Sequence, residues 1–464
     1  MSYSIAVQST DITPAAGSPG RYMAGYGWVK RINTGQVARR LRAQCAVIYD
    51  SGVPNILLRI DVVGLPAPVH DTIRSQVVAA GLVQSSSDFL IVSSHTHSGP
   101  ALGDHPDVEI VYDLSDAERD EVNTYAGIFV GQIMTLIRQT AAAPSTPVNL
   151  SYANASVSIS VNRVGLPWNP TDTPILLARS VANNAPVAVF FGHACHGVCR
   201  GDDLVFDADF PGMASQLIES TFHCPALFFQ GACGDLNPDN TGSDAAVVDV
   251  GTRLGNTVVK AVQGGGFTPV SGPILTRLTT NTLPFFVDPT DPTVNARLIS
   301  KYQARVAALG PSTDPTNEAA VRHANKTLAA LTGHTVTSGI PETVQCWRFG
   351  TSLTIIGISN EPLSGWHVGL HNLYKAAPLW VMGYLNTVAT YCPGDDTLWH
   401  RVPSGGAYES GWDADPEIAG VGGSIMAYGW PSSLRSTQPP GTTPAAPNST
   451  EGMTMATCRS ELGV

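Results

Sequence analysis

Phe89–Pro100 reads FLIVSSHTHSGP, an apolar run of strand length that leads directly into two histidines one residue apart. Side chains alternate between the two faces of an extended segment, so the H-x-H spacing places the rings of His95 and His97 on one side. Two interpretations are open for this stretch. Either the histidines are ordinary surface residues of a loop, or they lie at a strand end because both converge on one metal ion or one substrate.

Three other apolar runs end in the same abrupt way. PVAVFF leads into GHACHG with His193 and His196, ALFF leads into QGACGDLNP with Asp235, and LTIIGIS leads into NEP with Glu361. In open α/β sheets, apolar strands are covered by helices on both faces, and ligands bind beyond their carboxyl ends. Two histidine motifs and a carboxylate at such ends are typical of a His/His/carboxylate zinc site. The four segments together predict an α/β fold with a metal at the strand ends.

The composition indicates a soluble globular protein and excludes several partners. The chain has 464 residues, 14% of them charged, with a net charge of -11 and no run of Lys or Arg. Nucleic acid and anionic membranes are therefore poor partners. No window approaches the roughly 18 apolar residues of a transmembrane segment. The N-terminus does not resemble a signal peptide, so we expect a cytoplasmic protein, or a secreted one whose leader was removed. The oligomeric state is left open.

Eight scattered cysteines form no C-x-x-C pair. Cys195 and Cys199 flank His196, which allows a thiolate–zinc site, but reduced and buried cysteines are the favoured interpretation.

Strand and helix patterns alternate along the chain, without an internal repeat. CAVIYD and NILLRIDVVGL predict paired strands, residues 70–82 a helix, and residues 113–140 a long helix whose capping pattern is Ser115 with Glu118. Two helical segments, 294–309 and 318–331, lie in an expected insertion at about 290–335 within a domain spanning 1–430. The Pro-, Ser- and Thr-rich residues 431–464 predict an extended, peripheral tail.

Short motifs in one order along residues 7–412 resemble those of the neutral ceramidase family. They are DITP at 11–14, MAGYG at 23–27, HTHSGP at 95–100, VNR at 161–163, ACHG at 194–197, DADFPG at 207–212, GACGDLNP at 231–238, SNEP at 359–362 and NTVATY at 386–391. The resemblance implies a mixed-sheet catalytic domain of the α/β class, with helices on both faces and one Zn2+ per chain at the carboxyl ends of the strands.

The resemblance also implies a ligand set of His95, His196, Glu361 and Tyr391. Each has an ordinary alternative: a loop histidine, a carboxylate at a helix N-terminus for Glu361, or a half-buried phenol for Tyr391. His193 is a rival of His196, which is favoured because it aligns with the family's ligand; His193 then becomes a hydrogen-bonded core residue.

Further roles follow from the same match. His97 is assigned to proton transfer or carbonyl contact, Tyr391 also to catalysis, and Arg163 to oxyanion or substrate anchoring, with a surface salt bridge as the alternative for Arg163. Tyr408, in AYES, resembles a tyrosine that reaches the family's site.

Two aspartates and one asparagine complete the predicted site. Asp209 and Asp235 are candidates to orient the histidines, although Asp209 equally suits a helix start. Asn237 stands where the family motif has serine, so any role of that hydroxyl is absent.

These assignments predict a zinc-dependent hydrolase that cleaves an amide bond with a metal-activated water. The segments ALGDHPD, RGDDLVFDAD and PDNTGSD form polar loops near the predicted metal. They favour a soluble amide over long-chain ceramide, which needs an apolar mouth. A zinc-dependent esterase or lactonase, a true ceramidase, and a zinc- or lipid-binding module without activity are the alternatives.

Overall fold

The computed structural model describes residues 3–26, 30–103, 114–285, 287–394, 397, 409 and 450–464. Its strands are β1 (Tyr3–Asp11), β2 (Val37–Arg39), β3 (Arg42–Asp50), β4 (Val53–Ile60), β5 (Phe89–Ser93), β6 (Thr146–Ser156), β7 (Ser160–Asn162), β8 (Asp172–Ser180), β9 (Pro186–His193), β10 (Phe206–Asp207), β11 (Ala226–Gln230), β12 (Leu236–Pro238), β13 (Thr268–Val270), β14 (Ile274–Pro284), β15 (Gly339–Phe349), β16 (Leu353–Ser359), β17 (Glu361–Pro362), β18 (Leu379–Leu385) and β19 (Tyr391–Cys392). Its helices are α1 (Ala67–Ala79), α3 (Asp116–Ala142), α4 (Asp209–Phe222), α5 (Asp244–Gly264), α6 (Pro292–Leu309), α7 (Pro315–Thr332), α8 (Ser364–Leu373) and α10 (Thr450–Leu462), with short 3-10 turns η1 (Pro19–Arg21) and η2 (Ser86–Asp88).

A 13-stranded mixed sheet is the scaffold, in the order β11-β9-β8-β6-β1-β3-β4-β5-β18-β16-β15-β14, with β13 beside β6. Strands β4 and β5, β9 and β11, and β16 and β18 pair in parallel, whereas β1, β3 and β4 pair antiparallel. The mixed α/β class is therefore confirmed.

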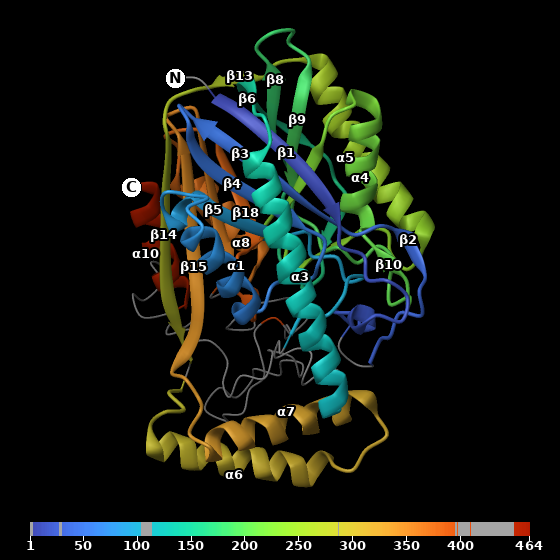
Figure 1. The fold of residues 1–464 in the computed structure, drawn as a ribbon. Helices are drawn as coiled ribbons and strands as arrows, with labels where there is room; N and C mark the ends of the chain where they lie inside the picture. The colour runs from blue at the N-terminus through green and yellow to red at the C-terminus, as the bar shows by residue number, and fades with distance from the viewer. Residues whose placement is uncertain are drawn as a thin grey trace.

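The sheet folds back so that its two halves face each other. Strand side chains alone fill the space between them, including Leu57, Phe190, Phe229 and Trp380. The rings of Phe229 and Trp380 meet edge to face with centroids 6.0 Å apart, which joins β11 to β18. Because this inner face is apolar, the helices lie on the outer faces (Figure 1).

Each outer helix buries one apolar stripe against the strands below it. α1 and α3 cover β3, β4 and β5, α4 and α5 cover β8, β9 and β11, and α8 and α10 cover β15, β16 and β18. The capping box expected at the start of α3 is present: the Ser115 hydroxyl accepts a hydrogen bond from the Glu118 amide, and the Glu118 carboxylate accepts one from Ser115.

The two helices predicted for the insertion, α6 and α7, form an antiparallel pair at one end of the molecule (Figure 1). They bury a small core of their own around Leu298, Tyr302 and Leu331. No helix in the described ranges is long and apolar enough to cross a membrane. All eight cysteines are buried and free of disulfide bonds.

The end of the chain differs from the predicted extended tail. Residues 450–462 form α10, which packs on β14 and β15 with Cys458 and Leu462 buried. The prediction of an extended tail is wrong for this segment because amino-acid composition does not report contacts with distant strands. Residues 431–449 lie outside the described ranges.

Candidate functional site

The predicted strand ends converge, and the HTH and ACHG loops lie directly against each other. The amide of His97 donates to the carbonyl of Gly197 over 2.9 Å, and Thr96 pairs with Gly197 as an isolated parallel bridge. A Cβ atom on Gly197 would lie 2.6 Å from the His95 carbonyl oxygen. Only glycine allows this approach, which brings the rings of His95, His97 and His196 together.

Four donor atoms gather in this space. His95 Nε2 lies 3.1 Å from His97 Nε2 and 3.3 Å from Glu361 Oε2. His196 Nε2 lies 3.5 Å from the same Glu361 oxygen. Zinc–nitrogen and zinc–oxygen bonds of about 2.0–2.1 Å in a tetrahedron separate neighbouring ligand atoms by about 3.3 Å. The ligand atoms of His95, His97 and His196 all lie within 4.8 Å of one another.

The outer nitrogen of each predicted ligand histidine is fixed by a backbone carbonyl. His95 Nδ1 lies 2.6 Å from the Val63 oxygen, and His196 Nδ1 lies 2.7 Å from the Cys233 oxygen. A carbonyl only accepts, so both Nδ1 atoms carry a proton, and Nε2 is the nitrogen that each neutral ring presents to a metal. His196 Nε2 is buried with no hydrogen-bond partner in the described residues.

The electrostatics of the site suit metal ligation. Burial, followed by the nearby Arg163 and His95, lowers the pKa of His196 to about 3. Burial alone would raise the pKa of Glu361, but His95 and His196 hold it well below its usual range. Neutral imidazoles and an ionised carboxylate are the forms in which these side chains bind zinc.

His97 stands beside the cluster with a different environment. Its carbonyl accepts a hydrogen bond from Arg31 Nη1 over 2.7 Å, and its ring meets Tyr26 edge-on with centroids 5.1 Å apart. A Cβ atom on Gly25, in the MAGYG motif, would lie 2.5 Å from His97 Nδ1, which explains glycine there. Burial and the adjacent His95 and His196 lower the pKa of His97 well below its usual value, so the ring is neutral.

Tyr391 lies in register with Glu361 on the two-stranded β17–β19 ribbon. Its hydroxyl accepts a hydrogen bond from Arg163 Nη2 over 3.2 Å. The Arg163 guanidinium also donates to the Gly234 carbonyl over 2.8 Å and forms an ion pair of 2.6 Å with Glu409. Arg163 therefore positions Tyr391.

Asn237, the position that departs from the family's serine, accepts from Arg163 Nη1 over 3.1 Å. Glu409 is a site residue that the sequence interpretation missed: it selected Tyr408 next to it, and Tyr408 lies outside the described residues.

The expectation that Asp209 or Asp235 orients a histidine ring is not met, because the carbonyls of Val63 and Cys233 take those places. Asp235 instead accepts from the Ser364 amide and hydroxyl and from Asn162 Nδ2, each over 2.7 Å. It thus joins the loop after β11 to the start of α8 and to the VNR motif.

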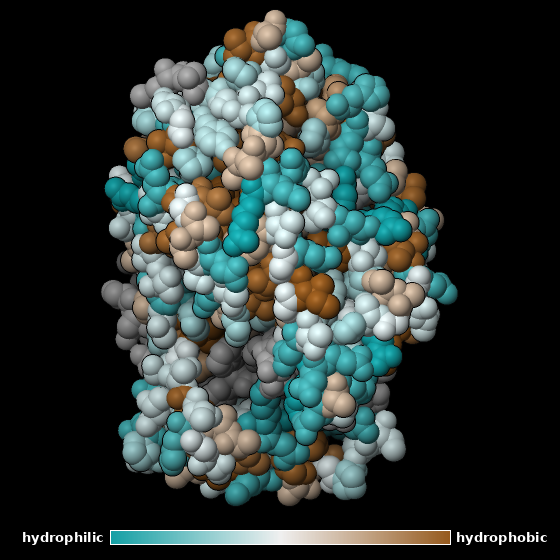
Figure 2. Space-filling model, in the orientation of Figure 1, coloured by the Kyte–Doolittle hydropathy of each residue, from teal (hydrophilic) through white to brown (hydrophobic). Residues whose placement is uncertain are grey.

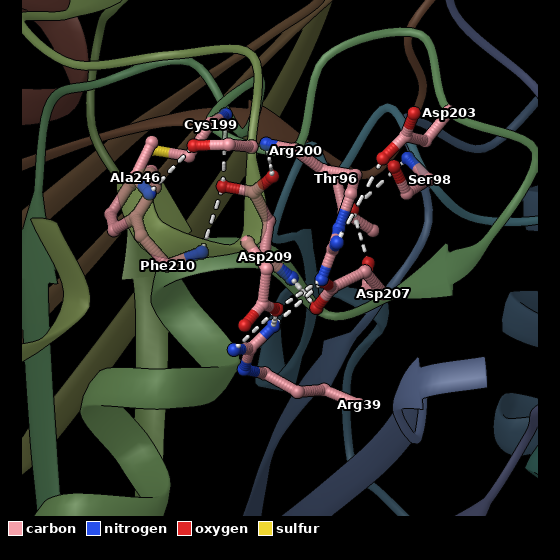
Figure 3. A network of polar contacts seen from close by, with 12 residues as sticks. Arg39, Thr96, Ser98, Cys199, Arg200, Asp203, Asp207, Asp209, Phe210 and Ala246 are labelled. Atoms are coloured by element: carbon pink, nitrogen blue, oxygen red, sulfur yellow. Dashed lines mark hydrogen bonds and ion pairs between the residues drawn. The ribbon is translucent and has the colours of Figure 1, made fainter. Parts of the chain in front are cut away.

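Asp209 holds the loop that follows His196. Its carboxylate accepts from the amides of Cys199 and Arg200 over 3.2 and 2.9 Å, as well as from Phe210 at the start of α4 (Figure 3). Asp209 is therefore at the helix start, as expected, and its carboxylate holds the backbone of this loop instead of a histidine ring.

Asp207 links that loop to the HTH segment. Its carboxylate binds Arg39 and Arg200 at 2.8 and 2.5 Å, and its carbonyl accepts from the Thr96 hydroxyl over 2.6 Å (Figure 3). The network fixes the two histidine loops relative to each other.

Tyr384 is a second residue that the sequence interpretation missed. Its hydroxyl lies 3.3 Å from both Glu361 Oε2 and Cys233 Sγ, and its ring lies against His95 with centroids 4.1 Å apart. It is the penultimate residue of β18, an apolar strand of sequence LWVMGYL that reaches the site.

His193 lies apart from the cluster. Its Nδ1 is 3.0 Å from the Asp172 carbonyl oxygen, and its side chain lines a separate cavity. The choice of His196 over His193 for the cluster agrees with this placement.

Comparisons with known proteins find similarity at the level of structure. No family model and no curated protein sequence matches the chain. A solved structure described as "Ceramidase complexed with C2" superimposes with a TM-score of 0.63 and 17% identity, covering 85% of this chain and 70% of that one. The neutral ceramidase from Pseudomonas aeruginosa superimposes with a TM-score of 0.62 and 18% identity, covering 85% of this chain and 68% of that one. The chain thus has a ceramidase-like fold.

Proposed function

We propose that this chain is a zinc-dependent hydrolase that cleaves a linear amide bond. The observation that carries the proposal is the separation of 3.3–3.5 Å between the Glu361 carboxylate and the Nε2 atoms of His95 and His196. Two neutral imidazoles and one carboxylate form the donor set of catalytic zinc sites. Tyr391 is the proposed fourth ligand. Bound zinc at this place would supply Lewis acidity and lower the pKa of a coordinated water to about 7.

The chain's own residues complete the chemistry. His97, adjacent to the donor set, would take a proton from water and return it to the leaving amine. The Tyr391 hydroxyl can donate a hydrogen bond to the oxyanion that develops from the carbonyl, and Arg163 holds that hydroxyl over 3.2 Å. The carbonyls of Val63 and Cys233 keep the two histidine rings in one tautomer throughout.

We propose a soluble amide as the substrate, in preference to long-chain ceramide. Arg31 donates hydrogen bonds to the carbonyls of His97 and Asp203 over 2.7 and 2.6 Å. Only the Arg31 side chain therefore separates the exposed, acidic Asp202–Asp203 turn from His97. On the face shown in Figure 2, hydrophobic residues occur in small groups among hydrophilic ones. The ceramidase-like fold keeps a true ceramidase as the second candidate, and an esterase or lactonase would use the same groups.

A substrate panel tests the proposal. Purified zinc-loaded protein is assayed with short soluble amides, esters and lactones, and with long-chain ceramide dispersed in detergent, and values of kcat/KM are compared. We expect an amide to give the highest value and His95→Ala to abolish it, while His334→Ala, which replaces an exposed histidine, retains it. Highest kcat/KM for long-chain ceramide would overturn the substrate assignment. Zinc binding without turnover of any compound would favour a binding module instead.

A further inference from the structure

The GHACHG segment contributes a second histidine whose environment resembles that of a metal ligand. His193, at the end of β9, is 2% exposed, and its Nδ1 lies 3.0 Å from the Asp172 carbonyl oxygen. Because a carbonyl only accepts, Nδ1 carries the proton and Nε2 keeps a lone pair. Nε2 is buried and has no hydrogen-bond partner in the described residues. His196 also combines a carbonyl-bound Nδ1 with a buried Nε2, and the Glu361 carboxylate lies 3.5 Å from that Nε2.

Further donors line the same small cavity. Helix α8 contributes His367 and His371, which lie four residues apart and therefore on one face. Their ring centroids are 4.3 Å apart. His367 Nε2 lies 3.1 Å from Asp172 Oδ2, close to the separation of about 3.3 Å expected for two ligands of a tetrahedral zinc ion.

Two of the imidazoles and the carboxylate are in the forms that bind a metal ion. Burial lowers the pKa of both His193 and His371 to about 4, so both rings are neutral at pH 7. Hydrogen bonds from His367 and Asn154 outweigh burial and lower the pKa of Asp172, which keeps its carboxylate ionised.

Size and access also fit a single ion. The cavity holds about 10 Å³, room for roughly one water molecule. Tyr152, Asn154, His371 and Leu379 also line a neighbouring open pocket of about 540 Å³, which gives a route from solvent.

We propose that His193, His367, His371 and Asp172 bind a second divalent transition metal of the zinc class, separate from the ion at His95 and His196. Imidazole and carboxylate donors in this ratio suit zinc, cobalt and nickel. This second set is more open than the set around His95, because its four donors do not all lie within 4.8 Å of one another. Its side chains must therefore move closer together to hold one ion. An ion there would join α8, which follows Glu361 in the chain, to β8 and β9.

Metal counting on the full chain tests this inference. Metal-free protein is equilibrated with Co2+ or Zn2+ at pH 7, and bound metal per chain is measured by equilibrium dialysis and elemental analysis. We expect two ions for the wild type and for His334→Ala, and one for the double variant His367→Ala/His371→Ala. His196→Ala should also bind one, and Co2+ absorption spectra should show that the ion retained differs between the two variants.

The outcomes separate the two metal sites. Two ions in the double variant, or one ion in the wild type that His196→Ala alone removes, would overturn the second site and leave the first intact. One ion in the wild type that only the double variant removes would support the second site and contradict the proposed function. If the double variant misfolds by circular dichroism, Asp172→Asn provides the same test through a smaller metal-induced rise in Tm.

Discussion

His95 Nε2 and Glu361 Oε2 lie 3.3 Å apart, although the two residues come from strand ends on opposite sides of β18 in the sheet. The contact is buried on both sides, with 1% of each side chain exposed. Removing a carboxylate–imidazole partner from such a site leaves a buried charge without compensation. The arrangement is therefore stable only with both partners, or with an ion between them.

Tyr391→Phe tests the catalytic role of the phenol beside Glu361. A hydroxyl that stabilises an oxyanion contributes mainly in the transition state, so we expect kcat to fall more than KM rises. Steady-state kinetics with the best amide substrate measure both constants. A kcat/KM within about twofold of wild type, which is about 0.4 kcal/mol of transition-state stabilisation, would remove Tyr391 from the mechanism.

Arg163→Lys tests whether the guanidinium acts through Tyr391. Lysine keeps the charge but cannot reproduce the planar fork that binds Glu409, Gly234 and the Tyr391 hydroxyl. We expect lower kcat/KM and a non-additive double variant with Tyr391→Phe, with a coupling of at least about 0.5 kcal/mol. Additive effects would show that Arg163 acts independently, for example on the substrate.

Tyr384→Phe should weaken zinc binding. Its hydroxyl is 3.3 Å from the Glu361 carboxylate oxygen that faces both histidines, and loss of such an outer contact costs about 10–100-fold in metal affinity. Zinc affinity is measured by competition with a chelator. Tyr49→Phe, which removes a hydroxyl bound to the Ala141 carbonyl far along α3, is the matched control. Equal affinities in the two variants would assign Tyr384 a packing role alone.

Glu342→Gln should change how stability depends on pH. Burial raises the pKa of Glu342 to about 7, while the Thr454 hydroxyl of α10 donates to its carboxylate. A carboxyl whose pKa is raised in the folded state contributes stability that is fully present below its unfolded pKa of about 4.5 and is lost as pH rises through about 7. The loss amounts to about 3 kcal/mol at high pH.

The glutamine variant cannot ionise, so its free energy of unfolding should vary less between pH 4 and 8 and exceed that of wild type at pH 8. Urea unfolding across that range gives the values. Glu318→Gln, at a side chain that is 50% exposed, serves as the control. Parallel pH curves for wild type and Glu342→Gln would contradict the prediction.

The strands that position the site were predictable because most of them share one sequence pattern. Apolar strands that end in histidine or carboxylate identified β5, β9, β11 and β16, and the structure brings those ends together. The strand LWVMGYL ends in neither a histidine nor a carboxylate, so this pattern does not indicate Tyr384. Residue spacing alone could not decide whether His193 or His196 is the metal ligand. The resemblance to the family's motif selected His196.

Other features depend on contacts between segments far apart in the chain. That Val63 and Cys233 supply the carbonyls for the histidine rings cannot be read from residue types, since every residue has a carbonyl. The helix α10 could not be predicted from its polar composition. Burial of Cys458 and Leu462 against β14 and β15 stabilises this helix more than its local helix propensity does.

An anomalous-scattering map of zinc-loaded crystals, recorded on both sides of the zinc absorption edge, tests the proposed zinc site most directly. We expect a zinc peak about 2.0–2.2 Å from His95 Nε2, His196 Nε2 and a Glu361 oxygen, with the Tyr391 hydroxyl as the fourth protein ligand and His97 outside the bonding distance. A fully zinc-loaded crystal with no peak among these residues would contradict it, as would an ion bound by His97 in place of Glu361.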